Sequence, residues 1–237
     1  MLTKELVPTL ADLWGVPQAT AGTIDRSLAD AGFRRKWKGP RPPNMTRREG
    51  LHLLIACLAA EHATRAGEET AAWIRARCHY PTFHFSPDDS EYFEEFREMA
   101  RLGRAVDALL APFATPAFPG ASAFPAYVCL TDFLLVVCHL VEAGRIKPHR
   151  WALEANLSQR TASIEFFGAS DVANVNPLRS PTFDCGDHRR GQYRPTLITR
   201  DLKAEAPGLA VGAIIDRTAD PLAPGAAPET DWKGHLP

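Results

Sequence analysis

The most constraining feature of this chain is a glycine and a proline, two positions apart, that separate two helical patterns near its start. Residues 7–33 read VPTLADLWGVPQATAGTIDRSLADAGF. Gly15 ends the first pattern, because a residue that leaves a helix often needs a positive φ, which glycine adopts cheaply. Pro17 fits the first turn of the next helix, where its missing N–H costs nothing. The sequence therefore predicts two helices joined by a tight turn, the second from about Gln18 to Ala31.

The second predicted helix has an apolar side and a polar side. Thr20, Ala21, Ile24 and Leu28 recur at the spacing of an inward stripe. The opposite side is small and polar with one long cation, and it consists of Gln18, Ala19, Gly22, Thr23, Arg26 and Ser27. A helix with such a side suits the major groove of DNA.

The whole stretch resembles the helix-turn-helix superfamily of DNA-binding proteins, at about ten positions within some 20 residues. The resemblance implies that four residues read bases: Gln18, Ala19, Thr23 and Arg26. Arg26 would then face guanine and Gln18 would face adenine. The alternative is a helical hairpin that packs in this way for stability alone.

A basic segment follows the second helix. Residues 34–48 contain no acid, and their cations are Arg34, Arg35, Lys36, Lys38, Arg41, Arg47 and Arg48. Trp37 lies among them, and the sequence GPRPP at 39–43 stiffens the segment into an extended shape. We expect these cations to contact the DNA backbone or minor groove as an arm or a wing. The alternative is an ordinary solvated surface.

A wider resemblance covers roughly residues 5–66. The helical pair, the basic Gly/Pro segment and the Met-Thr-Arg-Arg helix start are similar to winged-helix-like regulators encoded near phage or gene-transfer-agent genes of proteobacteria. This resemblance implies a transcriptional repressor or activator on double-stranded DNA. We expect a homodimer, because one helix reads only a few base pairs, and a polymerase or co-regulator as a further partner. A phage-type DNA-packaging recognition subunit is the alternative.

Charge and cysteine usage agree with a cytoplasmic protein that binds DNA on one side only. The net charge is −1, but residues 1–50 hold nine Lys/Arg against five Asp/Glu, whereas residues 86–98 hold six acids against one arginine. The five cysteines are scattered and odd in number, as in reduced cytosolic proteins. The first residues lack the apolar core of a signal peptide. The longest apolar stretch, 126–143, is too short and too polar to span a membrane.

The remaining pattern predicts a mainly α fold with an α+β module in the C-terminal half. Thr46 to Glu49 form a capping box that starts a helix to about residue 66. Further helices are expected at 68–78 and 88–111, a loop at 78–84, and a helix (or a strand) at 131–143. Alternating residues predict a hairpin over 151–157 and 162–166, then a strand at 196–202 and a helix at 208–218. The expected divisions are a DNA-binding domain 1–66, a helical extension 67–112, a linker 113–125, a dimerisation or partner-binding module 126–219, and a disordered tail 220–237.

Two residue groups are compatible with an enzyme. Cys78, His79 and His84 could bind zinc, but they supply three ligands at irregular spacing. Cys185 and His188 could act as nucleophile and base, although catalytic partners usually meet through the fold rather than along the chain. No phosphate-binding glycine loop and no hydrolase motif occur. The sequence therefore predicts no catalytic residue, no metal and no cofactor.

Overall fold

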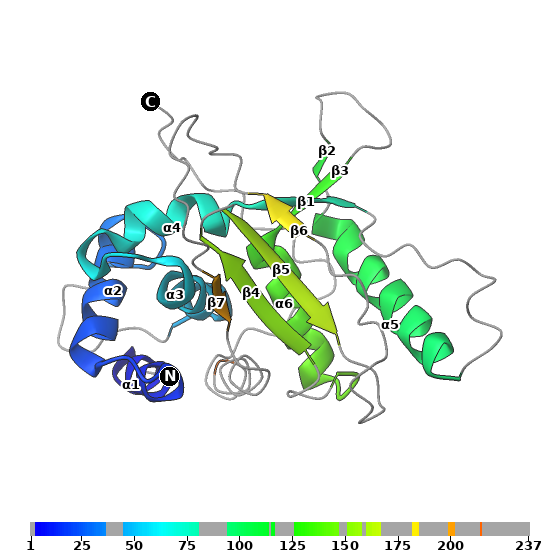
Figure 1. The fold of residues 1–237 in the computed structure, drawn as a ribbon, viewed down its shortest axis with the longest axis horizontal. Helices are drawn as coiled ribbons and strands as arrows, with labels where there is room; N and C mark the ends of the chain where they lie inside the picture. Colours follow the sequence, from blue (N-terminus) through cyan, green and yellow to red (C-terminus); the bar gives the residue numbers. More distant parts are fainter. Residues whose placement is uncertain are drawn as a thin grey trace.

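The computed structural model describes residues 3–36, 45–80, 94–113, 115–116, 126–146, 151–157, 160–166, 182–184, 199–201 and Ile214. These residues form mostly helices together with an antiparallel sheet, as predicted (Figure 1). A helical bundle at one end consists of α1 (Thr3–Trp14), α2 (Gln18–Asp30), α3 (Arg47–Ala59) and α4 (Ala66–Ile74). Helix α6 (Leu130–Glu142) lies against the sheet, and α5 (Glu94–Leu110) packs on α6 at the end of the molecule away from the bundle. None of the described helices is long and apolar enough to cross a membrane.

The α1–α2 hairpin forms as the sequence predicts. Gly15 has a φ of +62°. Its N–H donates to the Asp12 carbonyl at 3.3 Å, and the next N–H, of Val16, donates to the Ala11 carbonyl at 3.0 Å. These two bonds satisfy the last carbonyls of α1 and turn the chain sharply. Pro17 then precedes α2 as its N-cap residue.

The capping box at the start of α3 is confirmed. The Thr46 hydroxyl accepts the N–H of Glu49 at 3.2 Å, and the Glu49 carboxylate accepts the N–H of Thr46 at 2.8 Å. The helix ends at Ala59, however, and not near residue 66. The N–H groups of Glu61 and His62 bond instead to the Glu69 carboxylate, at 2.8 and 2.9 Å. A short 3₁₀ turn, η1 (Ala63–Arg65), then leads into α4.

The described residues form a sheet of seven strands, all paired antiparallel, in the order β2-β3-β1-β6-β5-β4-β7. The predicted hairpin is confirmed as β4 (Trp151–Asn156) and β5 (Thr161–Phe166), and the predicted third strand as β7 (Thr199–Asp201). The remaining strands are β1 (Arg77–Tyr80), β2 (Thr115–Pro116), β3 (Ala126–Cys129) and β6 (Thr182–Asp184). Residues 77–80 were predicted as helix end and loop. They form a strand because they pair with β3, far away in the sequence.

The sheet also crosses the segment predicted as a linker. β1 precedes residues 113–125 and β3 follows them, yet the two strands pair side by side. β2 lies within the segment, at the edge of the sheet. A proline such as Pro116 is tolerated at an edge, where its missing N–H breaks no ladder. The proposed boundary at 113–125 is therefore wrong, since it does not separate two independent folding units.

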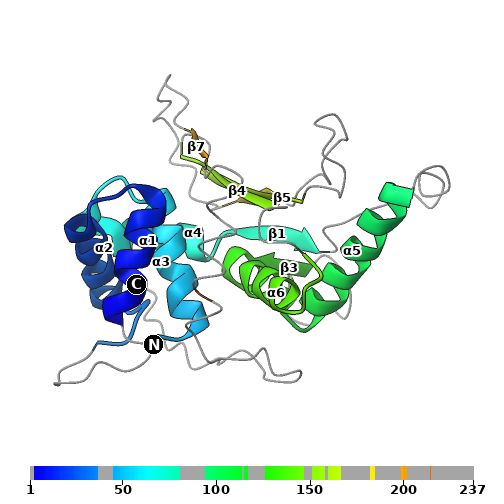
Figure 2. The same cartoon turned by 90° about the horizontal axis from the view of Figure 1, so that it is seen from below.

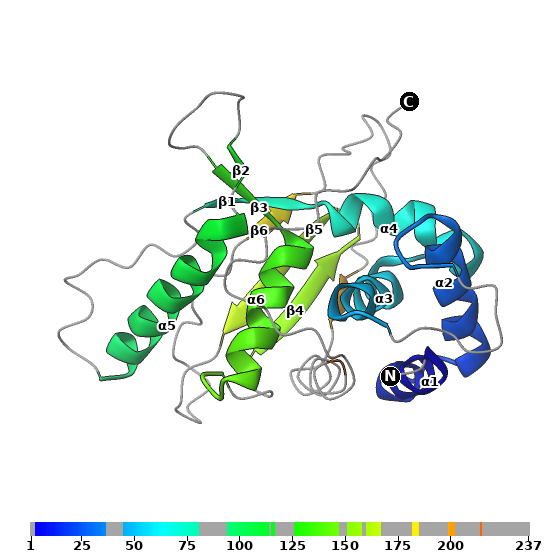
Figure 3. The same ribbon diagram turned by 180° about the vertical axis from the view of Figure 1, so that it is seen from behind.

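Helix α6 covers one face of the sheet (Figures 2 and 3). Its predicted helical state is confirmed, and Gly144, with a φ of +67°, follows its end. Phe133 of α6 meets Phe183 of β6 edge to face, with ring centres 5.4 Å apart. Ile214 is described as a single helical, fully buried residue within the predicted helix 208–218. The rest of that helix and the tail 220–237 lie outside the described residues.

Candidate nucleic-acid interface

The polar side of α2 lies on the surface of the protein. Gln18, Ala19 and Arg26 are exposed, and Thr23 is half-buried. On the opposite side Ala21, Ile24 and Leu28 are buried, as the apolar stripe predicts, while Thr20 is only half-buried. Because α2 is anchored along one side, the other side is held at the surface in a fixed orientation.

Local hydrogen bonds order the side chains on this surface. The Thr23 hydroxyl donates to the Ala19 carbonyl at 2.9 Å and accepts from Nη2 of Arg26 at 3.2 Å. Gln18 donates to the Asp12 carboxylate at 3.5 Å, a long contact between two exposed side chains. A guanidinium has five N–H donors in a planar fork, so the bond to Thr23 leaves Arg26 able to donate further. Such a fork can recognise either a guanine edge or a phosphate.

Ser27 does not belong to this surface, contrary to the sequence pattern. Its hydroxyl donates to the carbonyl of Thr64 at 3.1 Å and accepts the N–H of Gly67 at 2.9 Å. A Cβ at Gly67 would lie 2.5 Å from the Cβ of Ala31 and from the carbonyl oxygen of Ser27. The end of α2 and the start of α4 are therefore in backbone contact, and Ser27 joins them.

The basic segment is largely neutralised by acidic residues elsewhere in the fold. Each of its described cations forms an ion pair: Arg34 with Asp25 (2.9 Å), Arg35 with Glu49 (3.2 Å), Lys36 with Asp30 (2.8 Å), Arg47 with Glu142 (3.1 Å) and Arg48 with Asp132 (2.7 Å). Lys38 and Arg41 lie outside the described residues. The predicted backbone contact is wrong for Arg47, whose side chain is only 2% exposed, and Arg34 is largely buried.

Lys36 is the described cation of this segment that is best placed to exchange its partner. Its side chain and that of Asp30 are 58% and 76% exposed. Ion pairs of this kind contribute about 0–1 kcal/mol. A phosphate can therefore replace Asp30 at little cost.

Glu49 holds the two ends of segment 37–44, which itself lies outside the described residues. On one side its carboxylate accepts the backbone N–H of Arg35 at 2.8 Å and two guanidinium N–H groups at 3.2 and 3.3 Å. On the other side it accepts the N–H of Thr46. Burial opposes ionisation of Glu49, yet the hydrogen bonds from Arg35 and Thr46 hold its pKa below the usual value. Arg35 is thus joined through Glu49 to the start of α3.

Arg47 and Arg48 connect the helical bundle to the sheet. Arg47 binds Glu142 at the end of α6, and Arg48 binds Asp132 in its first turn. Asp132 also accepts a hydrogen bond from the Cys129 thiol. The start of α3 therefore lies across α6 and is held at both ends of that helix.

A buried polar cluster lies behind the exposed side of α2. Asp25 is 6% exposed, and Nε of Arg34 lies 2.9 Å from its Oδ1 without the alignment of a hydrogen bond. Burial raises the pKa of Asp25 to about 6, against the opposing effect of Arg34 and with a further contribution from Glu49. On α3, Nδ1 of the buried His52 lies 2.9 Å from the Phe33 carbonyl, and burial lowers the pKa of His52 to about 4.

The residues considered for zinc binding or catalysis are only partly described. Cys78 is buried in β1, and this burial raises the pKa of its thiol to about 12. His84, Cys185 and His188 lie outside the described residues. Within the described ranges, no three His, Cys, Asp or Glu side chains gather as they would around a metal.

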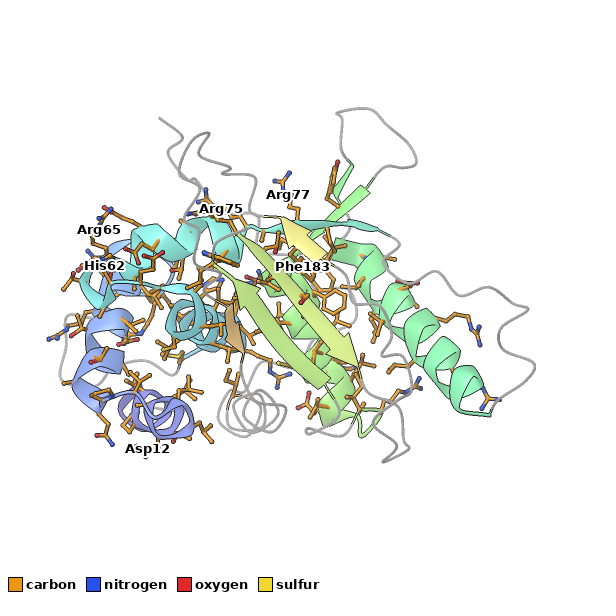
Figure 4. All side chains as sticks on the ribbon, viewed as in Figure 1. Asp12, His62, Arg65, Arg75, Arg77 and Phe183 are labelled. Atoms are coloured by element: carbon orange, nitrogen blue, oxygen red, sulfur yellow. The ribbon has the colours of Figure 1, made fainter. Side chains whose placement is uncertain are left out.

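Sequence reasoning missed two exposed arginines, at the end of α4 and the start of β1. Arg75, at the end of α4, is exposed, and its guanidinium carbon lies 6.0 Å from the centre of the Phe33 ring. Arg77 is also exposed and lies on the same edge of the molecule, together with Arg65 (Figure 4). No local signal marks them, because the fold brings α4 to α2.

Comparisons of the chain with protein-family models, with curated proteins and with solved structures found no match.

Proposed function

We propose that this protein binds double-stranded DNA through the α1–α2 pair, used as a helix-turn-helix, and that it regulates transcription. The observation that carries the proposal is the exposed polar side of α2, which presents Gln18, Ala19 and Arg26 while the opposite side is buried. A helix fixed in this way can enter a major groove without rearrangement of the bundle. Thr23 supports the proposal by holding Arg26 in place.

In this proposal the contacts divide into two classes. Gln18, Ala19, Thr23 and Arg26 meet base edges. Lys36 contacts a phosphate, together with Lys38 and Arg41 from the neighbouring segment. Arg35 and Arg48 act indirectly, because their acidic partners hold the segment and α3 in position. A homodimer would place two copies of α2 on half-sites about one helical turn apart, and a polymerase or co-regulator would bind elsewhere on the molecule.

The test begins with selection of a preferred duplex from a random DNA pool, followed by titration with wild type and Arg26→Ala. The variant is expected to bind the selected site with about 1–3 kcal/mol less free energy of binding. It should also lose its preference at one base position. Arg101→Ala removes an equally exposed arginine from α5, at the opposite end of the molecule (Figure 1), and should leave base preference unchanged.

An equal loss of affinity for every DNA sequence would show that Arg26 does not read a base. Absence of binding to any duplex at low ionic strength would refute the proposal itself. Light scattering provides an independent measurement, for which we expect a dimer. A ring of about eight or more copies would favour a DNA-packaging subunit instead.

A further inference from the structure

We propose that Arg75 and Arg77 form a second contact with the DNA phosphate backbone, along the edge formed by the end of α4 and the start of β1. The inference rests on the proposed function and extends the interface from the α1–α2 pair to the edge formed by α4 and β1. Neither arginine belongs to the basic segment 34–48. The contact would therefore extend the DNA-binding surface beyond α2 and that segment.

Arg75 is fixed next to α2 through Phe33. Phe33 closes the end of α2, since its N–H donates to the Leu28 carbonyl at 2.9 Å. The Phe33 ring is buried and is packed edge to face on His52, with ring centres 5.8 Å apart. Arg75 places its guanidinium over this fixed ring. An exposed cation restrained by such a contact loses less conformational entropy when it binds a phosphate.

Arg77 lies on the same outward side as Arg75. Exposure alternates along this stretch, because Ala76 and Cys78 are buried whereas both arginines are exposed. The backbone between them is held by the N–H of Leu130, which donates to the Ala76 carbonyl at 2.8 Å. Figure 4 shows both side chains along one edge of the molecule. The two side chains therefore extend from one edge of the molecule, on either side of a backbone carbonyl that is held by Leu130.

The charges around this edge are mixed, because Arg77 lies opposite Asp184 in the pairing of β1 with β6, while Arg65, Arg75 and Arg77 supply cations to which a phosphate backbone can bind. Arg65, further along the same edge, is paired with Glu68 at 3.5 Å. Glu69 is occupied by the ring of His62 and by two backbone N–H groups. Arginine forks match phosphate geometry, and the sugar-phosphate backbone that flanks a groove-bound helix supplies phosphates at regular spacing. DNA already bound at α2 is thus the occupant that this edge fits.

The test uses the full chain and the selected duplex, with fluorescence anisotropy over a series of salt concentrations. Each lost phosphate contact should make the slope of log K against log salt less steep by about 0.9. We therefore expect R75Q/R77Q to make this slope less steep by about 1.8 and to leave the base preference unchanged. The matched control is R101Q/R104Q on α5, which removes the same charge from two exposed arginines and should keep the wild-type slope. Arg75→Lys should also keep it, because the charge remains although the packing on Phe33 changes.

The outcomes separate the two proposals. Equal slopes for R75Q/R77Q and R101Q/R104Q, with normal wild-type binding, would overturn this inference and leave the proposed function standing. A loss of slope in Arg75→Lys comparable with that in R75Q/R77Q would also overturn it, because the effect would then follow from packing. Wild-type protein that binds no duplex would overturn both. A reduced slope confined to the α4–β1 variants would establish the second contact.

Discussion

At the scale of single residues, Asp25 is an ionisable carboxyl group in a buried position. It lies on α2 directly beside Arg26, and it is almost fully buried. Burial penalises its charged form, and the nearby Glu49 adds repulsion, while Arg34 compensates in part. A buried carboxyl of this kind stabilises a fold best when it carries a proton. The stability of the bundle behind α2 should therefore depend on pH.

We expect Asp25→Asn to stabilise the protein relative to wild type increasingly as pH rises. The folded-state pKa, about 6, exceeds the ordinary value of 3.8. The contribution of Asp25 is thus fully present below pH 3.8 and is lost as pH rises through 6. The gap between the variant and wild type should widen by on the order of 2–3 kcal/mol between pH 4 and pH 7.5 in urea unfolding.

Asp30→Asn makes the same chemical change at an exposed site of the same helix, where the partner is Lys36. It should alter the free energy of unfolding by less than about 1 kcal/mol across this range. A constant difference between Asp25→Asn and wild type at all pH values would contradict the role assigned to the buried carboxyl.

At the scale of elements, the contact between α2 and α4 depends on a residue without a side chain. We expect Gly67→Ala to destabilise the protein by about 1–3 kcal/mol, because the new methyl group would meet Ala31 and the Ser27 carbonyl at 2.5 Å. Chemical denaturation measures the change. Gly22→Ala is the matched control on α2, where a Cβ meets nothing within 4 Å, and it should stabilise the helix by roughly 0.5–1 kcal/mol. Equal effects of the two substitutions would show that α2 and α4 are not in close contact.

The elements that the sequence predicts well are those with local signals. Gly15, the Thr46–Glu49 capping box and Gly144 each act within a few residues, and the helices they delimit were placed correctly at those ends. β1 has no such signal, because four residues are too few for a period and its partner strand is remote. For the same reason the sequence could predict the exposed side of α2 but not the acids that bind the basic segment. The partners of Arg47 and Arg48 lie 95 and 84 positions away.

At the scale of the whole molecule, the described helical bundle and sheet share one continuous core. Buried residues run from Leu6 in α1 to Ile164 in β5 without a break between clusters. A Cβ at Gly50 would lie 3.3 Å from Ile214 and 3.4 Å from Leu6, so the Ile214 side chain packs beside α3 and α1. Together with the Arg47 and Arg48 ion pairs, these contacts argue against a DNA-binding domain that folds alone within residues 1–66.

This continuity leads to a prediction about unfolding. We expect α2 and the β4–β5 hairpin to unfold in one cooperative transition, because neither can open without exposing the shared core. Glu142→Ala should lower the free energy of unfolding of α2 and of the β4–β5 hairpin by the same amount, on the order of 3 kcal/mol. The reason is that it removes the carboxylate that faces the buried Arg47. Arg47→Met should cost less, because the Glu142 that it leaves behind is 44% exposed and can be hydrated. Hydrogen exchange with mass spectrometry in rising urea measures each segment separately. Different midpoints for α2 and for β4–β5, or a Glu142→Ala effect confined to one of them, would mean that the two parts are stabilised independently.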